Sequence, residues 1–592
     1  LPGWEINSLK AITDAVGWYY TYPRRIAVAG RVPILFLGTL LGALIYRWAQ
    51  DLGGHNAALL ALALYAFDPN CIAHAALITT DTAATLFIVA TLYVMYHWSR
   101  ANHTPYARWS KLTLAGVLLG LALLTKVSAL MLIPVTGAIV LIKAWVLEKR
   151  AKQSLVRAAL WLSSLLLLAG FTVWAGYRFE VATVPGFASH VPAATHLKIY
   201  LSLREHYELG HPAYALGRVS HHGWWWYFPL AFILKTPLPV LILGFINLGR
   251  ICSVLSMRLS RRWLSRLPAL LSLSLFPAAY AVSALFSTVD IGYRHLLPLL
   301  PFLQLTTGVG MGSAWTLPPL RLVRTARLRH LTLTILLGWM ALGTMSTLPY
   351  PLTFFNEIAG GPSQGYRYLV DSNLDWGQNL WDLRRWMDQH GERHVFYAHY
   401  SPARPETYGV PADFLPPDPR AVEFTPWHPA PGLYAIGATV LQGPYAPDLN
   451  TFAWFRYHEP IAVLGHALFL YRVPPSPTPS WAVLCAGTLE PALLKARTGN
   501  PMIRIIRPDC TQSQVYPERE GPGLYVTPPT LSEPDSGYLL LGERNAAGDP
   551  TLHVFSVDHG APAPEHPIVP TVTMDGPLAF LGYTVVTEQP AP

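Results

Sequence analysis

Three ionisable side chains stand just before or at the start of one long apolar run. The stretch FDPNCIAHAALITTDTAATLFIVA contains Asp68, His74 and Asp81. An ionisable group at membrane depth costs about 2.5–3.5 kcal/mol on insertion scales, so each such group marks a candidate site. Asp81 follows two threonines and also fits a helix N-cap, where its charge stabilises the helix start. We predict that Asp81 is an acidic site residue, a role that capping can accompany, and we take Asp68 and His74 as further candidates.

Two lysines interrupt apolar runs. Lys126 ends LAGVLLGLALLTK and separates two such runs, where it can either anchor a helix at the interface or hold a lipid phosphate as a point charge. Lys235 lies deep in WWWYFPLAFILKTPLPVL, and Pro237 and Pro239 follow it. The prolines predict a broken helix whose free backbone groups need partners inside the protein. We interpret Lys126 as a phosphate ligand and Lys235 as a structural or lipid-phosphate contact within a helical bundle.

A short polar segment, VDIGYRHLL, precedes a later apolar run. It contains Asp290, Arg294 and His295. Arg294 can grip phosphate oxygens in a bidentate fashion, so this segment suits an anionic headgroup. An Asp290–Arg294 ion pair that only fixes the loop is the alternative.

Two adjacent histidines, His221 and His222, precede the aromatic cluster 224–227, which is typical of a membrane interface. They could bind a divalent cation, although the sequence indicates no third ligand.

The composition explains why these groups stand out. The chain has 592 residues, of which 52% are hydrophobic and only 13% charged, against roughly 25% charged in soluble domains, and its mean hydropathy is +0.30. Its formal charge of +9 does not indicate a nucleic-acid partner, because the basic residues gather in short loops. The loops 250–266 and 321–330 contain several arginines and no acid, which is the positive-inside pattern of membrane proteins.

A membrane crossing needs about 20 mostly apolar residues. The sequence predicts an α-helical polytopic bundle over residues 26–349, with ten candidate spans: 26–47, 55–67, 81–98, 112–126, 127–147, 156–177, 224–248, 267–287, 296–316 and 331–349. The basic loops 99–111, 148–157, 250–266 and 321–330 then share the cytoplasmic side of a bacterial-type plasma membrane. Residues 68–81, Lys126, 178–223, 288–295 and everything after 350 share the outer side, as do residues 1–25, so we expect a site at the outer face of the bundle.

The remainder of the chain has the composition of a soluble region. Residues 350–472 combine an amphipathic helix near 374–391 with short strands, which predicts an extracytoplasmic α/β domain. A Pro-rich linker at 473–481 precedes a β-rich segment, 482–592, which we expect to be a small sandwich. We find no internal repeat in either part. Cys485 and Cys510 could form a disulfide on that side of the membrane, or remain two free buried thiols.

Five segments in order resemble the phospholipid-carrier-dependent glycosyltransferases of the GT-C superfamily, related to protein O-mannosyltransferases and the aminoarabinose transferase. They are DPNCIAHAALITTDTAAT, LAGVLLGLALLTKVSAL, WWWYFPLAFILKTPLPVLIL, DIGYRHLLPLLPF and FFNEIAGGPSQGYRYLVDSNLDWGQNLWDL. The resemblance covers residues 60–470. The final segment, from 482, lies outside it.

The resemblance implies a membrane enzyme that accepts a polyprenyl-phosphate-linked sugar and transfers the sugar, with inversion, to a hydroxyl of a protein or cell-envelope acceptor. An acidic side chain would take the acceptor proton while cations hold the departing lipid phosphate. By position, Asp81 matches the acid of the family's TTD segment and Lys126 the lysine after the following helix. Arg294 and His295 match the outer loop before a late helix.

One departure concerns the superfamily's principal acidic motif, which lies in the first outer loop after the first helix. Glu5 and Asp14 are the only acids before the first predicted span, and neither stands in such a motif. We expect that upstream residues are missing from this sequence. The alternative is a non-catalytic relative that serves as an accessory subunit of a membrane complex.

Overall fold

The computed structural model describes residues 23–100, 105–147, 151–187, 189–255, 261–312, 326–401, 403–485, 487–511, 514–516, 521–531, 533–534, 537–558, 566–573 and 579–583. The chain divides into two compact units. Unit 1 comprises residues 1–213 and 221–374, and unit 2 comprises residues 214–220 and 375–592. Residues 1–22 of the predicted outer N-terminal segment lie outside the described residues.

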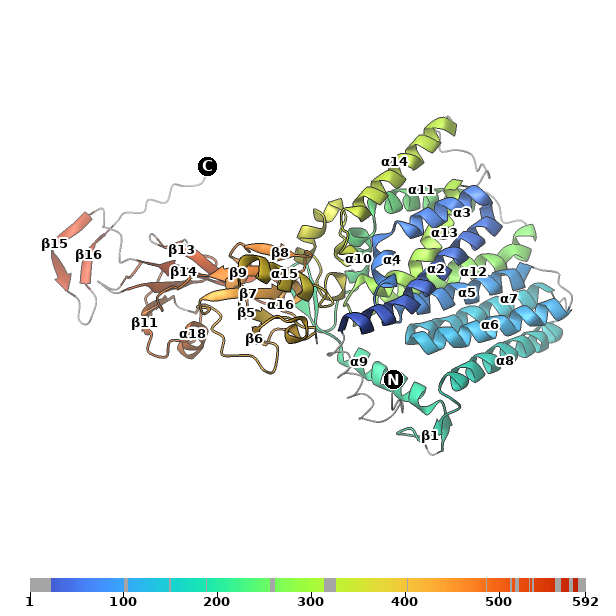
Figure 1. Cartoon of the computed structure of the whole chain (residues 1–592), viewed down its shortest axis with the longest axis horizontal. Helices are drawn as coiled ribbons and strands as arrows, with labels where there is room; N and C mark the ends of the chain where they lie inside the picture. The colour runs from blue at the N-terminus through green and yellow to red at the C-terminus, as the bar shows by residue number, and fades with distance from the viewer. Residues whose placement is uncertain are drawn as a thin grey trace. The chain divides into compact units, whose positions relative to one another are not determined.

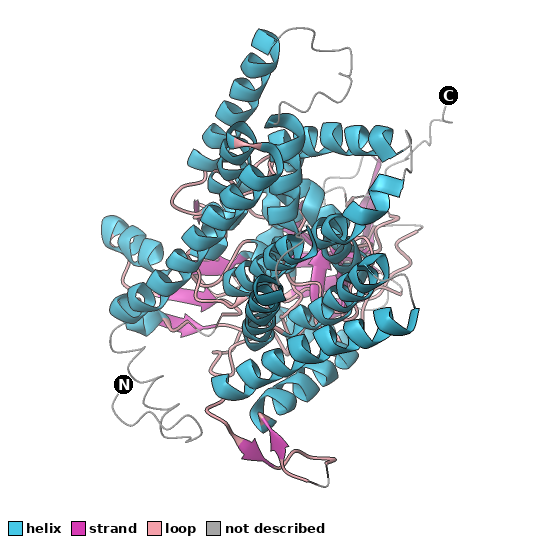
Figure 2. Ribbon diagram, turned by 90° about the vertical axis from the view of Figure 1, so that its right-hand side faces the viewer, coloured by secondary structure: helices cyan, strands magenta, loops and turns pink. Residues whose placement is uncertain are grey.

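Unit 1 is almost entirely helical (Figures 1 and 2). Its helices are α2 (Pro23–Gly53), α3 (His55–Ala66), α4 (Pro69–Ala75), α5 (Asp81–Arg100), α6 (Pro105–Thr125), α7 (Leu132–Leu147), α8 (Ala151–Gly176), α9 (Ala194–Leu209), α10 (Tyr227–Lys235), α11 (Leu238–Leu255), α12 (Arg261–Ala284), α13 (Leu300–Gly312) and α14 (Ala326–Met345). Short 3-10 helices are η1 (Val127–Met131), η2 (Tyr293–Leu299), η3 (Pro351–Thr353), η4 (Glu357–Ala359), η5 (Pro362–Arg367) and η6 (Asp371–Asn373). A short hairpin, β1 (Val181–Ala182) and β2 (Val191–Pro192), precedes α9.

Each of the ten predicted spans overlaps one of these helices or a broken pair of them. Among the described residues, four helices are long and apolar enough to cross a membrane unaided, or up to six if each bent pair counts as one span. The bent pairs are α3 with α4, at 66°, and α10 with α11, at 113°. A count of ten spans is therefore not confirmed. The remaining helices are shorter within the described residues or contain more polar residues.

The helices of unit 1 pack side by side around an apolar core. α6 packs against α5 and α8, and α3 packs against α2 and α13. Trp48, Met95 and Trp98 are among the large side chains buried in this core. On α13, a Cβ at Gly308 would lie 2.6 Å from the Cβ of Ala61, so only glycine permits this close approach of α13 to α3.

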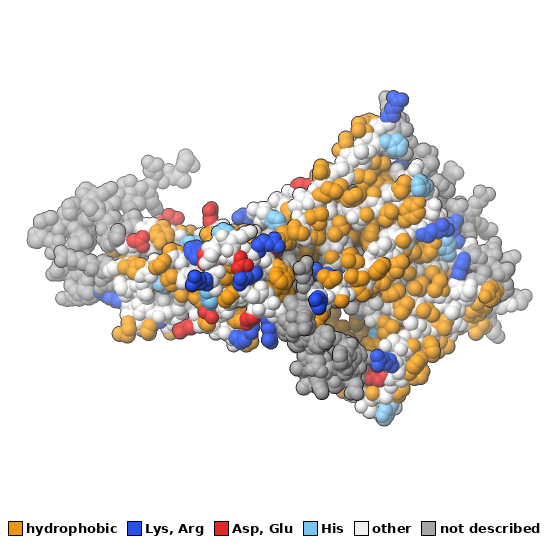
Figure 3. Space-filling model, viewed as in Figure 1, with side chains coloured by type: hydrophobic (Ala, Val, Ile, Leu, Met, Phe, Trp, Pro, Cys, Tyr) orange, Lys and Arg blue, Asp and Glu red, His pale blue; other side chains and the backbone are white. Residues whose placement is uncertain are grey.

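Hydrophobic side chains also dominate the outer surface of unit 1 that faces the viewer in Figure 3. On α2, for example, Val28, Leu35, Phe36 and Leu40 are exposed. Hydrocarbon tails, unlike water, solvate such a surface without penalty. A helical membrane region followed by a sheet-containing region is thus the architecture of this chain.

The predicted helix break near Lys235 is present, and the protein satisfies its free backbone groups. α10 ends at Lys235, and Thr236 takes the extended conformation that proline imposes on the residue before it. Asn356 Nδ2 donates hydrogen bonds to the carbonyl oxygens of Ile233, at 2.6 Å, and Thr236, at 2.8 Å. Asn70 Nδ2 donates to the carbonyl oxygen of Lys235 at 2.7 Å. The break is therefore a built feature of the bundle.

The boundary between the units lies at Leu374, later than the predicted start of the soluble region at 350. Residues 350–374 belong to unit 1 because their polar groups bind α10 and η2. Asn373 shows this most clearly: its Oδ1 accepts the N–H of Tyr293 at 3.0 Å, and its Nδ2 donates to the hydroxyl of Tyr227 at 2.9 Å. The first soluble-like residues thus complete the helical unit.

Unit 2 contains two five-stranded sheets within its described residues. The first consists of β5 (Val395–Ala398), β6 (Ala412–Phe414), β7 (Gly432–Gly437), β8 (Ala462–Leu464) and β9 (Leu468–Val473), in the order β6-β5-β7-β9-β8. The second consists of β10 (Trp481–Leu484), β11 (Arg504–Ile506), β12 (Gly523–Thr527), β13 (Tyr538–Arg544) and β14 (Pro550–Val557), in the order β11-β10-β12-β14-β13. Smaller elements are β3 (Ala213–Ala215), β4 (Arg218–Ser220), α15 (Leu380–His390), η7 (Pro405–Tyr408), α16 (Ala438–Gln442), α17 (Ala453–Arg456), α18 (Pro491–Thr498), β15 (His566–Thr573) and β16 (Ala579–Tyr583).

The two sheets have the same topology. In each, the first strand pairs in parallel with the second and third, the third pairs antiparallel with the fifth, and the fifth pairs antiparallel with the fourth. Both third strands begin with the text PGLY, at 431–434 and 522–525. In both, the glycine lies under an aromatic ring of the first strand, Phe396 over Gly432 and Trp481 over Gly523. Unit 2 thus contains the same fold twice, once in each of the two parts within which the sequence shows no internal repeat.

The predicted sandwich at 482–592 is also wrong for the described part of that segment. β10–β14 form a single mixed sheet, with the separate hairpin β15–β16. Alternating strands predict that one face is buried, but they do not reveal parallel pairing or strand order.

A disulfide joins Cys485 to Cys510 within this part, with Cα atoms 5.5 Å apart.

Candidate active site

Asp81, Lys126 and Arg294 come together from three separate segments of unit 1. Lys126 Nζ lies 2.5 Å from Asp81 Oδ1, and Arg294 Nη1 lies 4.0 Å from Asp81 Oδ2. The Asp81 side chain is only 3% exposed, whereas those of Lys126 and Arg294 are 19% and 21% exposed. One buried carboxylate therefore lies between two cations that retain access to the surroundings.

The local structure explains how each side chain reaches this point. Asp81 is the first residue of α5, where a carboxylate stabilises the exposed N–H groups of the helix. Lys126 has extended backbone angles, φ −157° and ψ 138°, between α6 and η1, so it turns its chain out of the helix. Arg294 belongs to η2, which packs against α5. The prediction that these residues share a site is consistent with their placement.

Two imidazoles flank the carboxylate. His74, in α4, and His295, in η2, both interact electrostatically with Asp81. His74 Nδ1 and His295 Nε2 are buried and have no hydrogen-bond partner among the described residues. Since buried polar groups are normally paired, these two nitrogens mark positions where a polar ligand group fits.

Two tyrosines that the sequence did not single out also reach this cluster. Tyr280, on α12, interacts electrostatically with Asp81, and Tyr207, on α9, with Lys126 and Arg294. The backbone oxygen of Tyr207 accepts a hydrogen bond from Thr288 Oγ1 at 2.5 Å, which ties α9 to the loop before η2. An aromatic residue inside or beside an apolar run carries no signal of this kind, so only the fold reveals it.

Asp68 serves the fold. It is the N-cap of α4, and its Oδ1 accepts the N–H groups of Asn70, at 2.9 Å, and Cys71, at 3.2 Å. Its Oδ2 lies 3.5 Å from Gln304 Nε2 on α13. The side chain is fully buried, so we assign it to helix capping.

The hydrogen bonds of Lys235 do not support the predicted contact with a lipid phosphate. Its Nζ donates three hydrogen bonds to backbone oxygens, those of Leu352 at 2.9 Å, Phe354 at 2.9 Å and Asn373 at 2.6 Å. An ammonium group has three hydrogens, so none remains for a phosphate. The residue is 1% exposed and lies over the ring of Phe355. Of the two predicted roles, the structural one holds.

Asp290 lies in the loop before η2 and contacts the loop before α10. Its Oδ2 accepts the N–H of Trp224 at 2.7 Å, and its Oδ1 is buried without a partner among the described residues. Burial raises the pKa of Asp290 to about 7, and the Trp224 hydrogen bond lowers it only in part. The carboxyl group joins two loops rather than forming the ion pair with Arg294 that was the alternative interpretation.

His221 and His222 are exposed beside this loop. The described residues contain no group of three or more His, Cys, Asp or Glu side chains that could hold a metal ion. The predicted role of this pair in binding a divalent cation therefore stays a prediction.

The sequence was also compared with known proteins. Residues 18–185, which contain Asp81 and Lys126, match the family described as dolichyl-phosphate-mannose-protein mannosyltransferase. A search of the curated proteins finds no match. Similar solved structures include ArnT from Cupriavidus metallidurans bound to undecaprenyl phosphate, at 13% identity and a TM-score of 0.36, covering 74% of this chain and 83% of that one. Another is the apo oligosaccharyltransferase of Archaeoglobus fulgidus, at 11% identity and a TM-score of 0.36, covering 74% of this chain and 61% of that one. The family match confirms the predicted resemblance over residues 18–185.

Proposed function

On the premise of this family match, we propose that the chain is a membrane glycosyltransferase. It moves a sugar from a polyprenyl-phosphate donor to an acceptor hydroxyl on the extracytoplasmic side, with inversion at the anomeric carbon. One observation carries the proposal: Asp81, Lys126 and Arg294 form a single cluster, two of its members lie in the matching segment, and the cations stay accessible.

Lys126 and Arg294 suit the leaving group of this reaction. As the bond between the sugar and the phosphate breaks, negative charge grows on the phosphate oxygens, and preorganised cations stabilise that charge. Lysine offers a point charge and arginine a planar fork, and both bind phosphate well. The unpaired ring nitrogens of His74 and His295 would hydrogen-bond the phosphate or the sugar beside them.

We assign Asp81 to holding the two cations in place. Each of its oxygens already faces a cation, Oδ1 facing Lys126 and Oδ2 facing Arg294. Without this carboxylate, two positive groups would lie close together in a largely buried site, which costs free energy. Asp81 is therefore a positioning residue in this proposal.

Two features support a lipid-linked donor and an extracytoplasmic reaction. An apolar groove of about 700 Å³ runs along α2, α3 and α4, and Cys71 and Tyr65, which line it, also line the small cavity beside His74. Such a groove suits an isoprenoid tail next to the phosphate site. The Cys485–Cys510 disulfide in unit 2 is typical of proteins outside the reducing cytosol.

The test is sugar transfer by the purified chain in proteoliposomes, supplied with a polyprenyl-phosphate-linked radiolabelled sugar and membrane-derived acceptors. We expect Lys126→Met to reduce the transfer rate at least a hundredfold, because one charge-stabilising group is worth about that factor. Lys198→Met, at an exposed position on α9, is the matched control and should leave the rate unchanged.

Transfer that proceeds equally well in Lys126→Met would contradict the proposal. Intact assembly of membrane complexes, together with an absence of transfer by the wild-type chain under all donor conditions, would instead favour the accessory-subunit alternative.

A further inference from the structure

We propose that unit 2 contains a second binding site, for a neutral sugar. A pocket of about 270 Å³ lies between its two five-stranded sheets, near the lower end of the size range of small-molecule sites. It is lined by β9 of the first sheet, by β12, β13 and β14 of the second, and by the Pro-rich linker between them. Nothing in the proposed transfer reaction uses this pocket, and it lies in a different unit from Asp81.

Aromatic rings form much of the pocket lining. Trp454 and Tyr471 come from the part of unit 2 that carries the first sheet, and Tyr538 from β13 of the second. Tyr538 is 53% exposed, so its ring is accessible to a ligand. The His458 ring stacks on Trp454 with centroids 3.6 Å apart. Because Trp454 and Tyr471 are buried, Tyr538 is the ring that can contact the apolar C–H face of a pyranose.

Several polar groups of the pocket are hydrogen-bond acceptors. His458 Nδ1 lies 2.8 Å from the carbonyl oxygen of Trp454. Because a carbonyl only accepts, Nδ1 must carry the hydrogen, which leaves Nε2 as an acceptor. Burial also lowers the pKa of His458, which favours this neutral form. Glu459 and Asp558 add carboxylate acceptors. Arg472 also lines the pocket, but its guanidinium group pairs with Glu392, which lies outside the lining.

These groups decide the class of ligand. An anion would meet the carboxylates of Glu459 and Asp558, which disfavour a further negative charge. A sugar hydroxyl can donate a hydrogen bond to these carboxylates or to His458 Nε2, while the C–H face of the sugar ring contacts Tyr538. A neutral sugar therefore fits the pocket better than an anion does.

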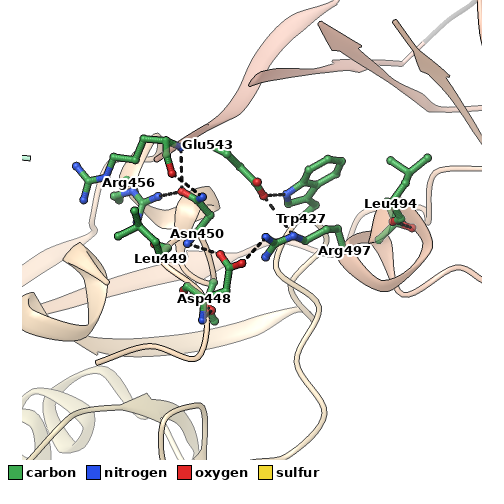
Figure 4. A network of polar contacts seen from close by, with 11 residues as sticks. Trp427, Asp448, Leu449, Asn450, Arg456, Leu494, Arg497 and Glu543 are labelled. Carbon is green, nitrogen blue, oxygen red and sulfur yellow. Dashed lines mark hydrogen bonds and ion pairs between the residues drawn. The ribbon is translucent and has the colours of Figure 1, made fainter. Parts of the chain in front are cut away.

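The walls of the pocket are held firmly. Trp427, which also lines it, donates its indole N–H to Glu543 Oε1 at 2.8 Å (Figure 4). Arg497 lies 3.3 Å from the same carboxylate oxygen and 3.0 Å from Asp448 Oδ2. These contacts join Trp427 and Asp448 to Arg497 on α18 and Glu543 on β13, so the two halves of the pocket keep their spacing. The pocket thus lies at the junction of the two repeats and needs both of them.

The experiment uses the full chain in detergent micelles, titrated with methyl α-mannopyranoside and methyl α-glucopyranoside and followed by saturation-transfer difference NMR. We expect saturable binding of at least one glycoside. Glu459→Gln and Tyr538→Ala should each weaken it at least fivefold, because the first removes a charged acceptor and the second an exposed ring. Glu423→Gln, exposed and outside the pocket lining, is the matched control and should bind as the wild type does.

The outcomes separate this site from the transfer site. Lys126→Met should retain glycoside binding, and a loss in that variant would overturn the proposal. An absence of saturable binding by both glycosides would overturn it too, as would displacement of the glycoside by tetramethylammonium, which would identify a cation site instead. Glu459→Gln and Tyr538→Ala should elute from gel filtration as the wild type does. A loss of glycoside binding in these variants then reflects the pocket rather than unfolding.

Discussion

At the scale of single residues, Asp290 shows what burial does to a carboxyl group in a loop between helices. One oxygen accepts the N–H of Trp224, the other has no partner among the described residues, and the pKa rises to about 7 from an ordinary 3.8. Between these two pH values, the folded state keeps a proton that the unfolded state has released. Stability from this group is therefore full below about pH 4 and is lost as the pH rises to about 7.

Asp290→Asn should make unfolding less dependent on pH. The amide keeps an oxygen for the Trp224 N–H and never ionises, so the stability of the variant relative to the wild type should rise between pH 5 and pH 8. At 1.36 kcal/mol per pKa unit, the rise is up to about 3 kcal/mol. Thermal unfolding of the solubilised chain at both pH values measures it. An equal difference in melting temperature at pH 5 and pH 8 would show that Asp290 does not titrate in this range.

Residue types alone revealed only some of the charged groups that lie close together. Asp81, Lys126 and Arg294 stood out because charge is rare beside apolar runs, and they do meet. The same argument named Lys235, whose partners are carbonyl oxygens 117 to 138 residues further along the chain. No local pattern shows such partners. Tyr280 escaped notice because an aromatic residue in an apolar run is ordinary.

At the scale of elements, the break between α10 and α11 depends on a few side-chain amides. Asn356 Nδ2 binds two of the freed carbonyl oxygens, and its backbone N–H binds a third, that of Leu234, at 2.9 Å. Inside an apolar bundle, a carbonyl oxygen that loses its hydrogen-bond partner costs free energy. Asn356 therefore determines whether the bend of 113° between the two helices persists.

Asn356→Ala should destabilise unit 1 by about 2–4 kcal/mol, because it leaves the oxygens of Ile233 and Thr236 buried and unpaired. The surviving fraction of monodisperse chain after a temperature series, read by gel filtration, measures the loss. Asn545→Ala, whose side chain bonds within an exposed turn, is the control and should cost less than about 1 kcal/mol. Equal losses of stability in both variants would show that Asn356 does not stabilise the break between α10 and α11.

Helix positions were predictable because apolar length is a direct consequence of membrane thickness. The break was predictable from Pro237 and Pro239. The start of the soluble region was not, because the apolar signal stops at 349 whereas residues 350–374 join unit 1 through polar contacts such as those of Asn373. Hydropathy does not record contacts of this kind.

At the scale of the whole molecule, unit 2 repeats one five-stranded topology, and a polar network joins the copies. Arg497 bridges Asp448 and the buried Glu543 across this network (Figure 4). Burial raises the pKa of Glu543, and Arg497 opposes that rise. The arginine therefore compensates the charge of a buried carboxylate.

Arg497→Met should destabilise unit 2 by about 3–5 kcal/mol, since it leaves the Glu543 charge without its cation. Adding Glu543→Gln to this variant should recover part of the loss. Arg420→Met, which breaks exposed pairs with Asp418 and Glu406, should cost less than about 1 kcal/mol. Denaturant unfolding followed by tryptophan fluorescence compares the three. A double variant as unstable as the single one would contradict the compensating role.

The repeat was in principle visible in the sequence, since PGLY occurs at 431–434 and 522–525. Four residues do not establish a repeat by themselves, and the strands around them differ in sequence. Strand order and parallel pairing, which make the repeat plain, arise from contacts across the sheet rather than along the chain. The expected sandwich failed for the same reason.

In the proposed reaction, Lys126 and Arg294 bind a lipid phosphate. The most direct test is the affinity of the purified chain for polyprenyl phosphate compared with the uncharged polyprenol of equal length, measured by native mass spectrometry. We predict that the wild type prefers the phosphate at least tenfold, and that Lys126→Met and Arg294→Gln each reduce this preference while polyprenol binding stays unchanged. Equal affinity of the wild type for the two lipids, or a preference untouched in both variants, would contradict the claim.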